Sequence, residues 1–374
     1  MSTKIKFLSG LILSTLVPML ASAASMDSRI DTLEKTVAMS TTSNPMSGMG
    51  AKPATALPLT TNTGWHAQIG FIYEQPNIGA SNFAVKQNNP SASTQTTEDV
   101  LDQDFKWAWG LTVGAGYKIQ RDWDMEVNYM YFDRSQTSKT NVGSGATLVP
   151  TRAKFNIVSD ASLLSSVEVA KSDYTITLNS FDVTATNIYY LQKYFSTGFK
   201  GGLRSQWLKL KQNIEYTGGV VLGNNTAHVN DSSKYWGFGP TGAINNNWTL
   251  GKGFSIFSNT GLSLLYSRFK VQSEQKLSGS NGQRFSTSSS MGSVIPELDA
   301  NLGLMYGSFF MEKKHYIAIR LGWDFHYYWN VNQMLLNNDS YTTVGNTLNM
   351  QRRTPNASED MSMQGLMCDL RWDF

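Results

Sequence analysis

Residues 316–331 read YIAIRLGWDFHYYWNV, and large apolar side chains occupy every second position of this stretch. The positions between them carry mostly small, polar or charged side chains, among them Arg320, Asp324 and His326. A period of two is typical of a β-strand with one apolar face. The apolar face extends over the roughly 10 residues that a tilted strand needs to cross a bilayer, so the stretch predicts a membrane-spanning strand.

The same alternation recurs from Gly64 to the end of the sequence and predicts ten strands. They are expected at about 65–73, 105–119, 123–131, 174–192, 198–210, 235–250, 254–269, 294–306, 316–331 and 366–374. Within 174–192 the apolar positions change parity between Leu178 and Phe181. That change predicts a β-bulge around Asn179 and Ser180.

Short and long connections alternate between these strands. Short ones are expected at about 120–122, 193–197, 251–253 and 307–314, and long ones at about 75–104, 133–172, 211–234, 270–293 and 332–364. Tight periplasmic turns alternating with long outer loops are typical of an outer-membrane barrel. We therefore expect an all-β fold, a transmembrane antiparallel up-and-down β-barrel over 64–374. An extra hairpin within 133–172 would make twelve strands.

The composition favours a membrane barrel over a soluble β-sandwich, whose strands also carry one apolar face. Of the 374 residues only 16% are charged, against about 25% in soluble domains, while 12% are aromatic, and Trp and Tyr gather toward strand ends. No internal run approaches the roughly 18 apolar residues of a spanning helix. A formal net charge of +3 is too balanced for a nucleic-acid partner. The single cysteine, Cys368, excludes an internal disulfide.

The first 23 residues predict export. Lys4 and Lys6 precede an apolar stretch at 7–20, which is followed by the small residues Ala21-Ser22-Ala23. This order is typical of a secretory signal peptide, so we expect cleavage after Ala23. Together with the strand pattern it predicts the outer membrane of a Gram-negative cell as the location.

Two short segments separate the signal peptide from the barrel. In 24–39 the apolar residues Met26, Ile30, Leu33 and Val37 recur at helical spacing, which predicts a short amphipathic helix. Such a helix could pair subunits, so a homo-oligomer is possible. Residues 40–63 are rich in Pro, Gly, Ser and Thr and predict a flexible linker.

Charged residues on the polar side of the strands are the candidate functional residues, because that side is expected to face the lumen. Opposite charges are nearly matched among Lys106, Lys118, Asp124, Glu126, Arg204, Glu297, Asp299, Arg320, Asp324, Asp369 and Arg371. Ionised groups in a narrow lumen must be paired or hydrated. A barrel of about eight strands has an interior that side chains fill, so ten strands permit either a narrow channel or a barrel plugged by ion pairs.

No pattern predicts a catalytic, cofactor or metal site. Residues 237–242 (GFGPTG) match a dinucleotide fingerprint by letters, but that fingerprint must open a helix, and here it lies inside an alternating stretch. The four histidines lack the spacing of metal ligands. Asp324 and His326 share a face, and we expect a structural charge pair rather than a hydrolytic one. An enzyme is not expected.

The C-terminal residues carry a signal and a resemblance. Leu370, Trp372 and Phe374 close an alternating stretch that is similar to the terminal strand recognised by the barrel assembly machinery, so that machinery and outer-membrane lipid are the expected partners. GKGFSIFSNTGLSLLYSRF (251–269), IPELDANLGLMYG (295–307) and LRWDF (370–374) resemble the Legionella-type major outer membrane protein family. The resemblance implies a pore for ions or small hydrophilic solutes. The alternative is a plugged barrel that acts as a surface structural or adhesive protein through its long loops.

Overall fold

The structure is a computed structural model that describes residues 64–88, 97–120, 123–143, 146–152, 167–192, 194–278, 284–310, 315–336, 338–344, 347–353 and 356–374. The expected signal peptide (1–23), amphipathic helix (24–39) and linker (40–63) lie outside the described residues.

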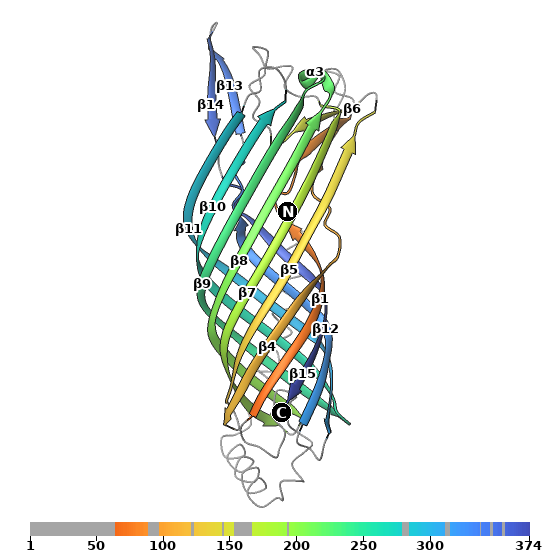
Figure 1. Cartoon of the computed structure of the whole chain (residues 1–374), viewed down its shortest axis with the longest axis vertical. Helices are drawn as coiled ribbons and strands as arrows, with labels where there is room; N and C mark the ends of the chain where they lie inside the picture. Colours follow the sequence, from red (N-terminus) through yellow and green to blue (C-terminus); the bar gives the residue numbers. More distant parts are fainter. Residues whose placement is uncertain are drawn as a thin grey trace, which may run out of the picture. The chain divides into compact units, whose positions relative to one another are not determined.

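Ten antiparallel strands close into one barrel (Figure 1), which confirms the predicted fold. Each strand pairs with the barrel strand before it in the chain, and β1 pairs with β15 to close the ring. The barrel strands are β1 (Gly64–Ile78), β4 (Ala108–Gln120), β5 (Trp123–Asn141), β7 (Val169–Gln192), β8 (Phe195–Thr217), β9 (Thr226–Gly251), β10 (Phe254–Leu277), β11 (Arg284–Phe310), β12 (His315–Asn332) and β15 (Glu359–Asp373).

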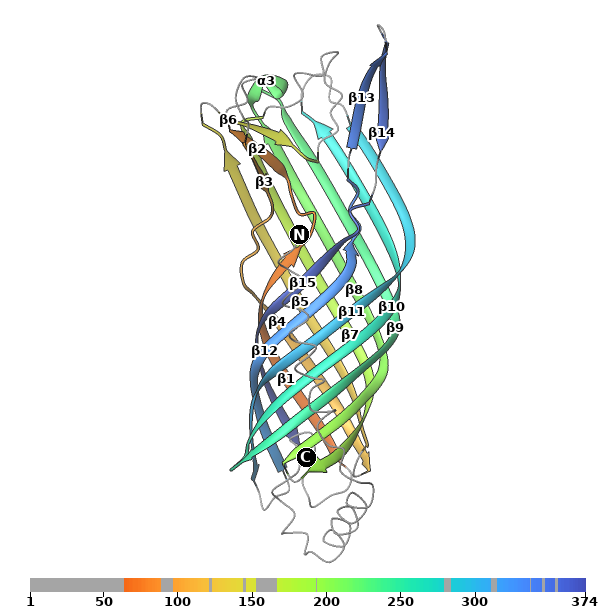
Figure 2. The same cartoon turned by 180° about the vertical axis from the view of Figure 1, so that it is seen from behind.

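Five further strands are not part of the barrel wall. The strands β13 (Asn338–Val344) and β14 (Thr347–Arg353) form a hairpin, visible beyond the wall in Figure 2. The strand β2 (Ala84–Asn88) pairs with both β3 (Thr97–Leu101) and β6 (Ala146–Pro150) in a separate sheet, the inner sheet. Because β6 joins the inner sheet and not the barrel, the twelve-strand alternative is wrong.

The only helix among the described residues is the four-residue α3 (Gly219–Leu222). No helix in the described part of the chain is long and apolar enough to span a membrane.

The barrel strands extend well into the segments predicted to be long loops. The strand β9 has 26 residues and β11 has 27, so most of 211–234 and 270–293 is strand. The turns of the four hairpins β4–β5, β7–β8, β9–β10 and β11–β12 mark one end of the barrel, the turn end. The opposite end, the loop end, carries the longer connections.

Exposed apolar side chains form a belt on the outside of the barrel that ends at the turn end. Aromatic rings lie at both of its edges, as in the girdles of membrane barrels. Toward the turn end these are Trp65, Trp123, Tyr189, Phe254, Tyr306 and Trp372, and toward the loop end Trp109, Tyr131, Trp207, Trp236, Tyr266 and Trp323. The belt defines the membrane-spanning part. Cys368 is exposed within it, whereas Val331, at the end of the apolar face predicted for 316–331, is completely buried inside the barrel.

The predicted bulge at Asn179 and Ser180 is absent. The pairing of β7 with β5 and β8 runs without a shift through these positions. Leu178 is completely buried in the barrel, whereas Phe181 is 39% exposed on the outside. The parity change has another cause. Between the belt and the loop end the apolar side chains of β7 face the lumen, whereas within the belt they face outward.

Candidate functional site in the barrel lumen

The lumen between the turn end and the loop-end girdle contains a polar cavity of about 260 Å³. Amides and charges dominate its lining, which includes Gln68, Asn128, Lys200, Asn245, Asn301 and Arg371. These side chains come from six different strands. They lie there because the polar positions of each strand alternate with the lipid-facing ones.

Of the eleven charged residues predicted to line the lumen, Lys106 is the exception. It is exposed in the irregular segment before β4, because that strand begins at Ala108 rather than at Phe105. Phe105 consequently points inward, 3% exposed, with its ring 5.2 Å from that of Tyr174. The other ten are buried or half-buried inside the barrel.

Arg204 joins three strands through its guanidinium. It makes a two-pronged contact with Asp182 (Nε to Oδ1 2.8 Å, Nη2 to Oδ2 2.9 Å). Its Nη1 also donates to Asp299 (2.6 Å) and to the completely buried Glu297 (3.1 Å). Three carboxylates therefore share one guanidinium, and the planar fork of arginine suits this arrangement.

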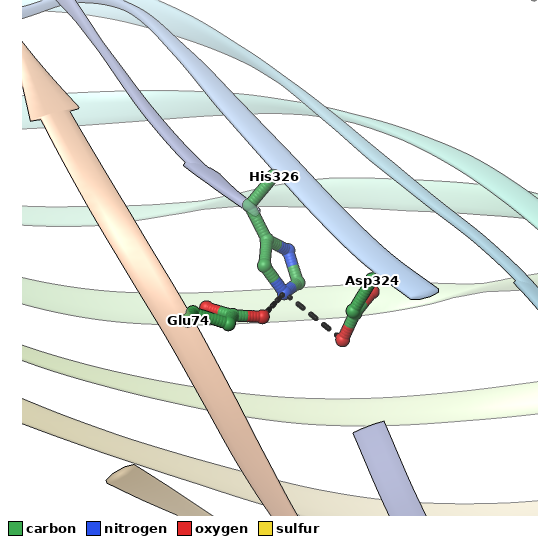
Figure 3. A group of neighbouring side chains, drawn as sticks. All are labelled: Glu74, Asp324 and His326. Carbon is green, nitrogen blue, oxygen red and sulfur yellow. Dashed lines mark ion pairs between the residues drawn. The ribbon is translucent and has the colours of Figure 1, made fainter. Parts of the chain in front are cut away.

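A second group surrounds His326 (Figure 3). Its Nδ1–H donates to Asp299 Oδ1 (2.6 Å), while Nε2 lies 3.3 Å from Asp324 and 3.5 Å from Glu74. Asp324 and His326, which share a face of β12, are thus neighbours in the structure. Glu74 was not among the predicted lumen residues. It follows the outward-facing position of Tyr73 on β1, and this alternation is the signal that could have identified it.

A third network lies toward the turn end. Arg371 contacts Asp373 (2.7 Å) and Asp124 (3.3 Å), and Asp124 also binds His66 (2.7 Å). Two further ion pairs lie beside it, Lys200 with Glu126 (3.0 Å) and Arg320 with Asp369 (3.1 Å). At least nine of the eleven predicted charges thus have an ionic partner among the described residues, and His66, Lys200 and Asp373 are partners that the sequence had not singled out.

A layer of buried apolar side chains lies in the lumen on the loop-end side of the charges. Phe132, Leu178, Leu208 and Tyr235 are consecutive register partners on four strands and are at most 3% exposed. Together with residues from other strands they belong to one buried cluster. We define the apolar layer as Ile78, Phe105, Phe132, Leu178, Leu208, Tyr235, Phe269, Ile295, Tyr328 and Met361.

The segment leading into the inner sheet is bound to the wall beyond this layer. Gln212 donates to the carbonyl of Ser81 (3.0 Å), and the hydroxyl of Tyr216 donates to that of Phe83. The guanidinium of Arg152, completely buried, donates to the carbonyl of Asn82 (3.2 Å). These contacts hold residues 81–83, which are not part of a barrel strand, inside the loop end of the barrel.

Arg152 also faces a buried acid. Its Nη1 lies 3.8 Å from Oδ2 of Asp231, and both side chains are completely buried. Burial raises the pKa of Asp231 to about 6, against the opposing effects of Arg152 and of a hydrogen bond from Ser273. Asp231 lies five positions beyond the girdle residue Trp236 on β9, outside the membrane-spanning part.

Comparison with known protein families shows to which family the chain belongs. A family model described as the Legionella pneumophila major outer membrane protein precursor matches residues 57–374. The chain belongs to this family. The match confirms the resemblance to the Legionella major outer membrane protein family seen at 251–269, 295–307 and 370–374. It also supports the outer membrane as the location.

Solved structures with similar folds include other outer-membrane barrels. Outer membrane protease OmpT from Escherichia coli is 9% identical (TM-score 0.39; 84% of this chain and 97% of that chain covered). The Pseudomonas putida toluene transporter TodX is 8% identical (TM-score 0.31; 83% and 89%), and the translocator domain of NalP from Neisseria meningitidis is 11% identical (TM-score 0.32; 84% and 90%). A search of the curated proteins found no match.

Proposed function

We propose that this member of the family is a closed barrel that serves the outer membrane as a structural protein and presents its loop end at the cell surface. The observation that carries the proposal is the apolar layer, whose ten members are at most 3% exposed. Ions do not cross a packed apolar layer, because unpaired charge in such surroundings is very costly. Longer connections are typical of the outer face of bacterial membrane barrels, and this supports the orientation proposed for the loop end.

The buried charges support a structural role for the lumen. Asp182, Glu297 and Asp299 converge on Arg204, and Arg371 holds Asp124 and Asp373. Arg204 thereby links β8 to β11, and Arg371 links β15 to β5, and neither pair of strands is adjacent in the ring. Asp324 and His326 are both buried, so the pair suits a structural contact better than hydrolysis of a bound substrate.

Solute entry into proteoliposomes tests the closed barrel. We expect vesicles that contain the folded full chain to resist swelling in arabinose as well as protein-free vesicles do. A double variant, Phe132→Ser with Leu208→Ser, places two hydroxyls in the apolar layer and is expected to admit more solute. Rapid swelling with the wild-type protein would reject the proposal.

The surface role has its own test in the β13–β14 hairpin, which forms a sheet separate from the barrel. We expect replacement of 338–353 by a short Gly-Ser linker to leave the barrel assembled, as measured by the mobility of unheated protein on gels. Adhesion of the bacteria to cultured host cells should fall. Unchanged adhesion would count against display through this hairpin.

A pore for ions or small hydrophilic solutes is the second candidate, and the polar cavity favours it. The cavity already provides about 260 Å³ of space with a lining of mixed charge. Conduction would require the apolar layer and the inner sheet to move aside. Swelling of the wild-type vesicles, with a rate that depends on solute size, is the result that this candidate predicts.

A further inference from the structure

Three potential ligand atoms converge inside the barrel where the sheet closes. Oxygens of Glu74 and Asp324 and a ring nitrogen of His326 all lie within 4.8 Å of one another (Figure 3). Glu74 belongs to β1, and the other two belong to β12. The strand between them, β15, places Gly365 in register with both Glu74 and Asp324, so this position of β15 adds no side chain between the two carboxylates.

The hydrogen bonding of this group is incomplete. Glu74 is completely buried, yet neither of its carboxylate oxygens has a hydrogen-bond partner among the described residues. The Nε2 atom of His326 has no hydrogen-bond partner there either. Buried polar atoms are nearly always satisfied by protein, water or an ion, and both of these side chains point toward the same spot (Figure 3).

We propose that Glu74, Asp324 and His326 bind one divalent transition-metal ion, with Zn²⁺ as the best-fitting cation. In a tetrahedral shell with bonds near 2.05 Å, ligand atoms lie about 3.3 Å apart. The distances from His326 Nε2 to Asp324 and Glu74, 3.3 and 3.5 Å, match that spacing. Imidazole with carboxylates is a donor set suited to zinc.

The surroundings supply what a metal site needs besides its ligands. Asp299 accepts a hydrogen bond from Nδ1–H of His326, which leaves the lone pair of Nε2 for the metal, as in carboxylate–histidine–zinc arrangements. Asp324 and His326 line the polar cavity, so an ion within the cavity can reach both ligands. The cation would also offset the excess of carboxylates around Arg204 and His326. It would join β1 to β12 across β15 and so reinforce the closure of the barrel.

Zinc content of the full chain in detergent tests the site. After treatment with EDTA and dialysis against limiting ZnCl₂, we expect about one tightly bound zinc per chain by mass spectrometry. Glu74→Gln and Asp324→Asn should each weaken binding at least tenfold, and the positioning variant Asp299→Asn by about 10- to 100-fold. Glu126→Gln, which removes another lumen carboxylate, is the matched control and should retain the metal.

The mobility of the unheated protein on gels identifies which variants fold. If either Glu74→Gln or Asp324→Asn does not fold, the other still tests the proposal. Wild-type protein that holds no tightly bound zinc would overturn the proposal, as would folded Glu74→Gln and Asp324→Asn proteins that bind zinc as the wild type does. The measurement is independent of conductance, so it separates failure of the metal site from failure of the closed barrel.

A different observation carries a second proposal, on the outer surface beside the loop-end girdle. Lys209 pairs in register with Lys234, and Lys234 with Lys270, so three exposed lysines lie side by side across β8, β9 and β10. Like charges directly opposite each other destabilise a sheet. None of the three forms an ion pair within the described part of the chain. The row lies just beyond Trp207 and Trp236, at the level of lipid headgroups.

We infer that this basic row binds the phosphates of a phosphorylated lipid in the outer leaflet, an inference that depends on the loop end facing the cell surface. The probe is diphosphorylated lipid A in detergent micelles, added to the full chain. Changing the three lysines to Gln should weaken binding more than tenfold. The control variant changes Lys139, Lys252 and Lys276 to Gln, which removes the same charge elsewhere on the exposed surface.

Competition distinguishes a lipid headgroup from free phosphate. Inorganic phosphate at equal concentration should not displace the lipid, whereas monophosphorylated lipid A should bind more weakly than the diphosphorylated form. Equal binding by the two triple variants would overturn the inference, and so would displacement by inorganic phosphate.

Discussion

Arg204 is the residue on which the charge balance of the lumen depends most. Its guanidinium alone bridges Asp182, Glu297 and Asp299, all within 3.1 Å. Removing one partner from a buried ionic network leaves the others uncompensated, at a cost of about 3–5 kcal/mol. We expect Arg204→Gln to lower the free energy of unfolding by this amount, measured by guanidinium unfolding in detergent with tryptophan fluorescence.

The matched control for that prediction is Arg284→Gln. Arg284 is 69% exposed and lies 3.8 Å from Glu274, and exposed ion pairs of this kind contribute little to stability. A change of similar size in both variants would contradict the network account and point to a general effect of losing positive charge.

Asp231 makes the stability of the loop end depend on pH. Burial raises its pKa from 3.8 to about 6, so between these values the folded state holds a proton that the unfolded state has lost. The contribution of this carboxyl to the free energy of unfolding therefore falls as the pH rises from about 4 to 6, by roughly 2 kcal/mol.

Asp231→Asn tests this dependence because it removes the titrating group and keeps the shape. We expect the variant to lose the decline between pH 4 and 6, as measured by denaturant midpoints at several pH values. The sign is decisive: a wild-type contribution that grows with pH in this range would mean that Arg152 outweighs burial and lowers the pKa of Asp231.

At the scale of the element, the end of β15 completes the barrel. Phe374 exchanges both backbone hydrogen bonds with Trp65 on β1 (2.9 and 3.2 Å), and its exposed ring lies 5.0 Å from that of Trp372. We expect deletion of Phe374 to reduce assembled protein in the outer membrane while export continues, measured by fractionation and gel mobility. Phe374→Tyr should assemble normally; normal assembly of the deletion variant would contradict the prediction.

The strand alternation was enough to predict all ten barrel strands, but not how far they extend. Within the belt, water and lipid require opposite faces to differ, so positions such as Phe181 carry a clear signal. Beyond the belt the exterior is polar and the apolar residues Ile176 and Leu178 face inward. The period is still two, but its phase is inverted, and this inversion was wrongly interpreted as a bulge.

The same reasoning explains which lumen residues were predicted. Parity alone placed ten charged residues inside, whereas Lys106 failed because an irregular segment precedes β4. Pairing partners depend on register and on side-chain length across the lumen. Arg204 and Glu297, for example, come from strands that are not neighbours in the ring. Neither register nor reach across the lumen can be derived from the periodicity of single strands.

At the scale of the whole molecule, the barrel has two apolar regions, one on its outer surface and one inside its lumen. The outer belt faces lipid, and the apolar layer crosses the lumen near the loop-end girdle. Between them, charged side chains are paired within the wall. Under the proposed function, a barrel arranged in this way anchors itself in the membrane without opening a path through it.

Single-channel recording in planar bilayers tests this claim most directly. With assembled full-length protein, whose insertion is established by gel mobility and by flotation with lipid vesicles, the account predicts no conductance steps in 1 M KCl even at high protein load. Reproducible steps from the wild-type protein, with an ion selectivity altered by Arg320→Ala or Glu297→Ala, would contradict it and establish the lumen as a pore.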